Sequence, residues 1–292
     1  KAERDMVKQK AGDLIQLLQN ERNKCIKKLS KLQDTLKEAQ DADRYRKMGE
    51  LVTAYMHQIQ KGDDALEAID YYDEAQPVIR IPLDPMLSPA ENAQRYFKKY
   101  NKLKNSQVAA TEQIEQTTQE IVYLEGVLQQ LDMAGLEDLE EIRDELAQQG
   151  YVKQRRNQGA KKKKTAKPSL PCFLSSENIP IYVGKNNTQN EYLTNRLADP
   201  SDTWLHTKDI PGSHVVIRSR QYGEATLHEA AMLAAYYSQA KTSSNVPVDY
   251  TLIRYVKKPN GAKPGFVIYE RQKTLFVTPD ETVIKALRPC KP

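Results

Sequence analysis

The chain contains the stretch Ser88-Pro89-Ala90-Glu91, which has the composition of a helix start. A serine at the N-cap, a proline at the first helical position and a glutamate three residues after the serine form a capping box. Apolar side chains then recur at heptad spacing as far as Met133, which predicts a helix over residues 88–133. These side chains are Ala93, Tyr96, Tyr100, Leu103, Ile114, Ile121, Leu124, Leu128 and Leu131.

The residues before this stretch predict a second long helix and a β-hairpin. Residues 3–60 contain no proline and also repeat apolar side chains at heptad spacing, with a change of register near Ala42. Residues 65–72 and 77–83 have the composition of two short strands joined by a turn. Each helix carries one apolar stripe, so we expect the two helices to pack as an antiparallel coiled-coil arm with the hairpin inserted at its turn.

A third, shorter helix is predicted over residues 136–149. It opens with acidic residues at its positive dipole end and stops at Gly150. The expected first domain is therefore the arm, residues 1–149. At about 1.5 Å per residue its two main helices would reach roughly 65 to 90 Å.

Charge divides the chain into three parts. Residues 1–149 hold 21 basic and 28 acidic residues, a net charge of −7, whereas residues 150–168 carry +8 and residues 169–292 carry +4. The positive parts would attract an acidic partner such as nucleic acid. Residues 150–168 form an expected linker whose basic run is Lys161, Lys162, Lys163 and Lys164. This run is either a solvated tether or a segment that lies along phosphates.

Residues 169–292 change to short strands separated by turns. One helix interrupts the strands over residues 226–241, where Thr226 and Glu229 form a second capping box. This pattern predicts a compact antiparallel α+β domain, so the fold class of the whole chain is α+β. The expected strands cover residues 170–175, 180–183, 203–208, 214–218, 250–258, 265–270 and 275–278.

Polar side chains that follow the strand at 180–183 are candidate nucleic-acid ligands. Lys185, Asn186, Asn187 and Asn190 lie in a run of amide and hydroxyl residues that can bond bases, sugars or backbone. The alternative is that the asparagines only tie up an irregular loop.

The next candidates lie on a strand and two turns. Strand alternation places Trp204, His206 and Lys208 on one face, which could stack a base and neutralise a phosphate, unless Trp204 belongs to the core. In the turn that follows, the Ser213 amide and hydroxyl and His214 could face an anion. The second turn carries three lysines and is either a solvated hairpin tip or a second phosphate contact. Its lysines are Lys257, Lys258 and Lys263.

Enzyme, metal and membrane functions find little support in the sequence. Cys25, Cys172 and Cys290 are odd in number and widely spaced, which predicts reduced thiols rather than a disulfide framework. No zinc-ligand spacing, nucleotide-binding glycine loop or nucleophile elbow occurs. No segment has the roughly 20 apolar residues of a membrane span. We therefore expect a binding protein with no cofactor, no metal, no small-molecule substrate and no membrane insertion. The chain begins without methionine inside a helical pattern, which suggests a fragment.

The run from Gly184 to Ile217, with Lys257 to Gly265 after it, resembles the NFACT-R domain of the NFACT family. The segments Gly49 to Ala54, Ile81 to Pro85 and Asn92 to Tyr100 are similar to the coiled-coil middle region of that family. The resemblance covers nearly the whole chain but omits the family's N-terminal domain and most of its helix-hairpin-helix region.

The resemblance implies a cytoplasmic ribosome-associated quality-control factor. Such factors bind large ribosomal subunits obstructed by peptidyl-tRNA, through rRNA, a stalk-base protein and tRNA, and support alanine tailing of the stalled chain. Related proteins of Gram-positive bacteria are described as cell-surface adhesins that bind fibronectin and lack a signal peptide. The sequence thus leaves two hypotheses: an RNA-binding fragment, and a fibronectin-binding fragment.

Overall fold

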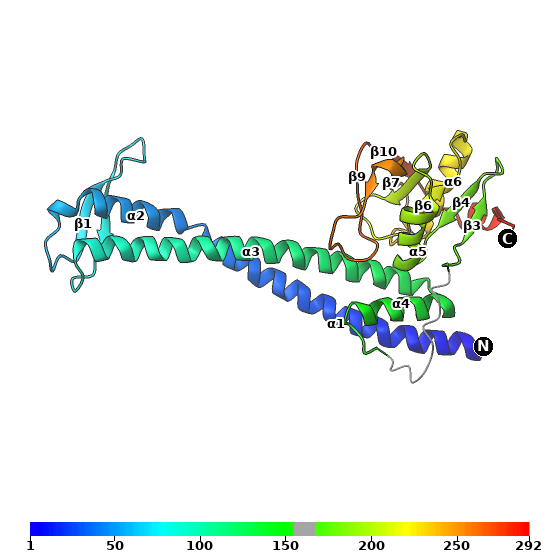
Figure 1. The fold of residues 1–292 in the computed structure, drawn as a ribbon, viewed down its shortest axis with the longest axis horizontal. Helices are drawn as coiled ribbons and strands as arrows, with labels where there is room; N and C mark the ends of the chain where they lie inside the picture. The colour runs from blue at the N-terminus through cyan, green and yellow to red at the C-terminus, as the bar shows by residue number, and fades with distance from the viewer. Residues whose placement is uncertain (155–166, 292) are drawn as a thin grey trace. The chain divides into compact units, whose positions relative to one another are not determined.

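The computed structural model describes residues 1–154 and 167–291 of the chain. It is an α+β structure of helices and antiparallel strands, which confirms the predicted fold class (Figure 1). The chain forms two compact units: Lys1–Asn23 together with Gln119–Pro292, and Lys24–Thr118. Among the described residues, no helix has both the length and the apolar character needed to cross a bilayer.

The first half of the chain is mostly helical. Its elements are α1 (Ala2–Ala39), α2 (Ala42–Ala54), the 3-10 turn η1 (Met56–Gln58), α3 (Pro89–Asp132) and α4 (Leu136–Gln148). The single helix predicted over residues 3–60 is wrong, because a turn at Gln40 and Asp41 divides it, at the point where the heptad register changes. The capping box of α3 is confirmed: the Glu91 N–H donates to Ser88 Oγ at 3.2 Å and the Ser88 N–H donates to Glu91 Oε1 at 3.4 Å.

The unit Lys24–Thr118 contains an antiparallel strand pair, β1 (Ala65–Ile69) and β2 (Val78–Pro82). Apolar side chains of both strands pack against α2 and the start of α3, and Figure 1 shows β1 beside α2. The core of this unit includes Leu51, Val52, Leu66, Ala68, Ile81, Leu83 and Ala93. Strand pairing alone would leave the apolar face of the hairpin in water, so the helices supply its cover.

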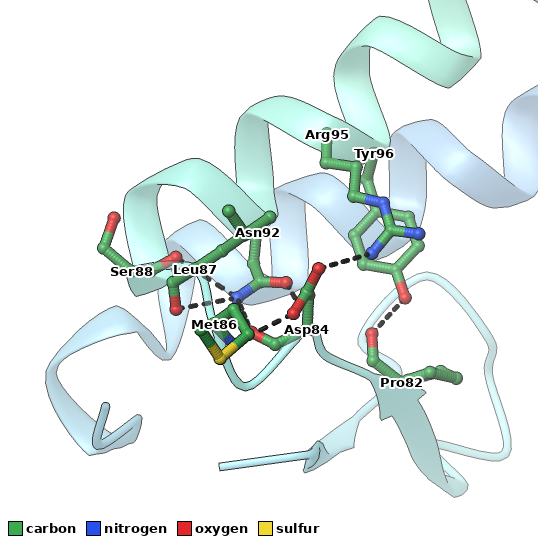
Figure 2. A network of polar contacts seen from close by, with 8 residues as sticks. All are labelled: Pro82, Asp84, Met86, Leu87, Ser88, Asn92, Arg95 and Tyr96. Atoms are coloured by element: carbon green, nitrogen blue, oxygen red, sulfur yellow. Dashed lines mark hydrogen bonds and ion pairs between the residues drawn. The ribbon is translucent and has the colours of Figure 1, made fainter. Parts of the chain in front are cut away.

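A network of polar contacts fixes the loop between β2 and α3 (Figure 2). The Asn92 Oδ1 accepts from the Asp84 N–H at 2.8 Å, and its Nδ2 donates to the carbonyl oxygens of Asp84 at 3.1 Å and Ser88 at 3.2 Å. Arg95 lies 3.6 Å from the Asp84 carboxylate. The loop is thereby held in one conformation, with the Met86 side chain 85% exposed.

The unit that holds residues 119–292 is built on a seven-stranded antiparallel sheet of order β10-β7-β5-β6-β4-β3-β11. Its strands are β3 (Cys172–Leu174), β4 (Pro180–Val183), β5 (Thr203–Thr207), β6 (Val215–Ile217), β7 (Val246–Leu252), β10 (Lys273–Val277) and β11 (Arg288–Pro289). A separate pair consists of β8 (Val256–Lys257) and β9 (Ile268–Tyr269), which follow the 3-10 turn η3 (Ile253–Tyr255). The remaining helices are α5 (Asn187–Tyr192), the π-helical turn η2 (Leu193–Leu197), α6 (Glu224–Tyr236) and α7 (Glu281–Ala286).

Alternating side chains of this sheet form two apolar clusters. Leu205, Val215 and Ile217 join the cluster that contains the alanine-rich face of α6. Trp204 and Val216 point to the opposite face, where they pack with Leu193 and Ile253. The predicted alternation of β5 is therefore confirmed, and both faces of its strand are covered.

The predicted start of α6 is wrong, because another segment caps it. The helix begins at Glu224, and the Gly223 and Thr226 N–H groups donate to Glu177 Oε1 at 3.2 and 2.8 Å. Hydrogen bonds from Thr226, first from its hydroxyl and then from its amide, lower the pKa of Glu177. Glu229 instead accepts from the Ser176 N–H at 2.9 Å. A cap supplied 46 or more residues away has no local sequence signal.

The expectation of three reduced thiols is also wrong. Cys172 and Cys290 form a disulfide, with Cα atoms 5.3 Å apart, while Cys25 is a buried cysteine outside this bond. The two cysteines meet because β11 pairs with β3 at the sheet edge, and the Cys290 N–H donates to the Cys172 carbonyl oxygen at 3.1 Å. Neither β11 nor α7 is predicted from the sequence, so the approach of these cysteines could not be foreseen.

Candidate nucleic-acid interface

The asparagines after β4 are buried and begin a helix, rather than forming an exposed polar loop. Asn186 is the N-cap of α5, where its Oδ1 accepts from the Gln189 N–H at 2.9 Å. Its Nδ2 donates to Glu141 Oε2 on α4 at 2.6 Å. Asn186 is 1% exposed, so the prediction that it contacts nucleic acid is wrong and its side chain joins α5 to α4.

Asn187 belongs to a second network of buried hydrogen bonds. Its Nδ2 donates to Glu145 Oε2 at 3.2 Å, and the same carboxylate oxygen accepts from the Tyr123 hydroxyl at 2.6 Å. Burial raises the pKa of Glu145 and that of Tyr123. Asn187 Oδ1 accepts from Gln130 Nε2 at 2.8 Å. Because every polar atom of the Asn187 amide faces protein, it too is structural and was wrongly assigned to the surface.

Asn190 holds the turn before β6 against the end of β4. Its Oδ1 accepts from the His214 N–H at 3.1 Å, and Asn190 is 2% exposed, so this predicted ligand is wrong as well. A Cβ on Gly184 would lie 2.0 Å from Asn190 Oδ1. Gly184 therefore permits the close approach that the hydrogen bond requires.

The aromatic rings of Trp204 and His206 on β5 cluster with His214, just before β6, and with Tyr269 on β9. Trp204 has no exposed surface, so the prediction that it stacks a base on an open face is wrong. Its ring lies 5.7 Å from that of His206, 5.3 Å from that of His214 and 4.8 Å from that of Tyr269. Val216 and Leu193 cover the same side of the sheet.

Neither histidine of this cluster carries a charge near neutral pH. Burial lowers the pKa of His206, and burial followed by the neighbouring His206 lowers the pKa of His214 to about 3. His214 Nδ1 lies 2.8 Å from the Thr194 hydroxyl. The Ser213 N–H donates to the Tyr237 carbonyl oxygen at 3.0 Å, and Ser213 is 4% exposed. The buried Ser213 and His214 therefore do not supply the phosphate contacts that the sequence predicted, whereas the half-buried His206 stays a prediction.

The predicted lysine ligands differ in their exposure and in their contacts. Lys208 and Lys257 are exposed, which suits contact with phosphates. Lys258 is exposed but forms an ion pair with Glu191. Lys185 lies 5.7 Å from the centre of the Tyr237 ring, and Lys263 lies 5.5 Å from that of Tyr123 and 5.7 Å from that of Tyr151. The basic run Lys161 to Lys164 falls outside the described residues.

A cavity of about 470 Å³ lies between the last turns of α3 and the sheet face that carries Trp204. Residues of five segments line it: the end of α3, α5, β5, the residues that follow β5, and residues 263–269. They include Tyr123, Gln130, Asn187, Trp204, His206, Asp209, His214, Lys263, Phe266 and Tyr269. Tyr123, Gln130 and Tyr269 were not predicted as site residues. Tyr123 and Gln130 lie in a long helix whose periodicity marks only its apolar stripe, and Tyr269 lies in an expected strand without a site motif.

Two family models match successive parts of the chain. Residues 1–165 match the NFACT N-terminal and middle domains, and residues 170–270 match the NFACT protein RNA binding domain. The chain belongs to the NFACT family. The resemblance seen in the sequence is thereby confirmed, and the exposed Lys208 and Lys257 lie within the RNA binding domain of this NFACT chain.

Curated and solved NFACT relatives resemble most of the chain. It is 54% identical over 286 residues to the Rqc2 homolog RqcH of Bacillus subtilis (strain 168), covering 98% of this chain and 50% of the relative. It is 44% identical over 290 residues to RqcH of Streptococcus pneumoniae serotype 2 (strain D39), covering 99% and 52%. The chain thus spans about half the length of these relatives. A solved structure, the C-terminal part of the fibronectin/fibrinogen-binding protein of Streptococcus suis, matches with a TM-score of 0.77 at 38% identity, covering 97% of this chain and 99% of that one.

Proposed function

We propose that this chain is the C-terminal part of a cytoplasmic ribosome-associated quality-control factor. It binds large ribosomal subunits obstructed by peptidyl-tRNA, acts by binding rather than by catalysis, and supports alanine tailing only within the full-length protein. The observation that carries the proposal is the match of residues 170–270 to an RNA binding domain. Relatives named as Rqc2 homologues support it.

The proposed RNA contacts are the lysines that the fold leaves exposed. Lys208 and Lys257 lie on the surface of the basic module, so they can approach a phosphate at little structural cost. Lys258 can join them only by leaving Glu191. The linker lysines, at Lys161 to Lys164, add charge without a shaped site. We expect rRNA or tRNA to be bound mainly through this charge.

A salt titration of the 292-residue chain tests this assignment. Binding of a fluorescent single-stranded rRNA oligonucleotide should weaken linearly on a log–log plot, by about 0.7 per phosphate contact. Lys208→Gln and Lys257→Gln should each reduce that slope by about 0.7. Lys61→Gln, an exposed lysine of the other unit, is the matched control and should leave the slope unchanged. Salt-insensitive binding, or equal slopes for all variants, would overturn the assignment.

The end of the unit Lys24–Thr118 is the proposed contact for a stalk-base protein. Its hairpin and loop expose large apolar side chains, with Tyr71 60%, Val78 66% and Met86 85% exposed. Exposed apolar groups of this kind are typical of protein contacts. Met86→Ser should weaken binding to isolated stalk-base protein while the RNA slope stays as in the wild type. Equal binding by both forms would remove Met86 from the contact.

A fibronectin-binding fragment is the second candidate function. It is favoured by the solved relative, which is described as part of a fibronectin/fibrinogen-binding protein, and by the Cys172–Cys290 disulfide, a bond typical of oxidising compartments. Surface plasmon resonance with fibronectin, repeated with RNA as competitor, tests it. Binding that persists with RNA present and with Lys161 to Lys164 replaced by Gln would support specific recognition. Loss under either condition would show attraction to basic charge alone.

A further inference from the structure

The cavity beside Trp204 has the size of a small-ligand site. Its volume of about 470 Å³ is enough for one planar ring system with a substituent. All of its lining residues belong to the unit that contains residues 119–292, so one folded unit forms the walls. The functions described above make no use of it.

Two residues that line this cavity each have a buried polar atom without a hydrogen-bond partner among the described residues. They are Gln130, through its Oε1, and Trp204, through its Nε1. Buried polar atoms are nearly always paired in folded proteins, because an unpaired one loses its hydration without compensation. Because both residues line the cavity, we take these atoms as the acceptor and the donor that a ligand bound there would meet.

The neighbouring hydrogen bonds determine which atom of the Gln130 side-chain amide has no partner. Asn187 Nδ2 donates to the Glu145 carboxylate, so Asn187 Oδ1 faces Gln130 as an acceptor. Gln130 must then present its NH2 group to Asn187, and its oxygen is the atom that remains. The indole N–H of Trp204 can only donate. A ligand in the cavity must therefore supply one donor for Gln130 and one acceptor for Trp204.

The other lining groups favour a planar ring with an attached anion. Aromatic rings of Trp204, Tyr269 and Phe266 line the wall, with the first two centred 4.8 Å apart. The Lys263 ammonium lines the same cavity and lies near Tyr123. The Asp209 carboxylate is a further acceptor in the wall. A nucleobase, which carries a donor and an acceptor side by side on its edge, with a nearby phosphate matches these groups.

We propose that this cavity binds an unpaired nucleobase, with Gln130 and Trp204 bonding the donor and the acceptor on its edge and Lys263 attracting its phosphate. The inference rests on the proposed function, because an RNA-binding chain meets unpaired bases. The base can belong to an RNA strand or to a free nucleotide.

The fluorescence of Trp204 reports on the cavity directly, since it is the only tryptophan of the chain. The 292-residue chain is titrated with AMP, CMP, UMP and ribose 5-phosphate. AMP, CMP and UMP should each quench the emission saturably, and ribose 5-phosphate, which has no base, should not quench. No saturable quenching by AMP or CMP up to millimolar concentration, or equal quenching by ribose 5-phosphate, would overturn the proposal.

Two variants separate cavity binding from folding defects. Gly126 lines the cavity on α3, and a Cβ there meets nothing within 4 Å, so Gly126→Leu should fill space without a clash and abolish quenching. Gln130→Met removes the acceptor and should weaken AMP binding roughly tenfold. Both variants should retain the unliganded emission spectrum if the fold is intact. AMP quenching that persists in a folded Gly126→Leu chain would contradict the cavity assignment.

Further measurements identify the source of the base and distinguish the cavity proposal from the RNA-binding assignment of the lysines. Tighter quenching by an oligoadenylate than by AMP would assign the base to an RNA strand, and the reverse order would assign it to a free nucleotide; both results support the nucleobase site. Lys208→Gln should change the RNA salt slope but leave AMP quenching unchanged. Gly126→Leu should do the opposite. Salt-dependent RNA binding by the wild-type chain without AMP quenching would overturn the cavity proposal alone, and AMP quenching without salt-dependent RNA binding would overturn the RNA-binding assignment alone.

Discussion

Asn92 and Asn187 are both buried asparagines that join separate segments, but their networks end differently. Asn92, in the unit Lys24–Thr118, places its oxygen and its NH2 group on backbone atoms of the loop beside it. Asn187, in the other unit, passes a hydrogen bond to Gln130, whose oxygen remains unpartnered beside a cavity. A closed network of polar groups stabilises a loop, whereas an open one beside a cavity marks a candidate binding site.

Removal of the closed network should have the largest effect on stability. Asn92→Ala leaves the Asp84 N–H without its partner and removes the bonds of the side-chain amide to carbonyl oxygens of the loop, so the free energy of unfolding of the unit Lys24–Thr118 should fall by about 2 to 3 kcal/mol. Hydrogen exchange of the β1–β2 region measures the loss. Asn101→Ala, at an exposed position on the same helix, should change exchange little. Equal protection in both variants would show that the network is dispensable.

Acid should weaken the histidine cluster of β5 before it weakens the strand pair of β1 and β2. His214 has a pKa of about 3 when folded and 6.5 when unfolded, so the unfolded state binds the extra proton between these values. As the pH decreases through that window, the free energy of unfolding decreases. At pH 5 this residue accounts for a loss of about 2 kcal/mol. The pKa of Asp70 is lowered by Lys47, so its contribution is lost only as pH falls below its ordinary value of 3.8.

Hydrogen exchange at pH 7 and pH 5, corrected for intrinsic rates, compares the two regions. Protection of β5 and β6 should fall at pH 5 and that of β1 and β2 should not. Burial raises the pKa of Glu145, which acts in the opposite direction, so His214→Gln isolates the histidine. The variant should lose less protection on acidification than the wild type. Equal pH dependence would refute a neutral buried His214.

Two glycines of the cavity-bearing unit should respond to alanine with opposite signs. Gly184→Ala places a Cβ against Asn190 and should cost about 2 kcal/mol. Gly126→Ala meets open space in a helix and should stabilise by about 0.5 to 1 kcal/mol. Thermal unfolding followed by circular dichroism measures both changes. A neutral Gly184→Ala would mean that the Asn190 bond is not required for the fold.

The smallest effect is expected at the exposed loop residue. Met86→Ser should change the free energy of unfolding by less than about 0.5 kcal/mol, because the side chain is 85% exposed. Denaturant unfolding compared with the wild type checks this value. A large destabilisation would mean that Met86 packs within the unit rather than serving a partner.

Local sequence signals predicted the elements whose determinants are local. The Ser88–Glu91 capping box and the strand Pro180–Val183 were found because capping and alternation act over a few residues. The cap of α6 by Glu177 and the Cys172–Cys290 disulfide depend on segments that only tertiary structure brings together. Residue type alone also could not separate the buried Asn186, Asn187 and Asn190 from surface ligands.

Cross-linking in living cells tests the central claim, that the chain serves a ribosome-bound factor through RNA contacts. The 292-residue chain, the Lys208→Gln/Lys257→Gln double variant and the Lys61→Gln control are irradiated in cells and purified under denaturing conditions. The account predicts that large-subunit rRNA is recovered with the wild type and the control, and much less with the double variant. Recovery of no ribosomal RNA, or equal recovery with all three chains, would contradict it.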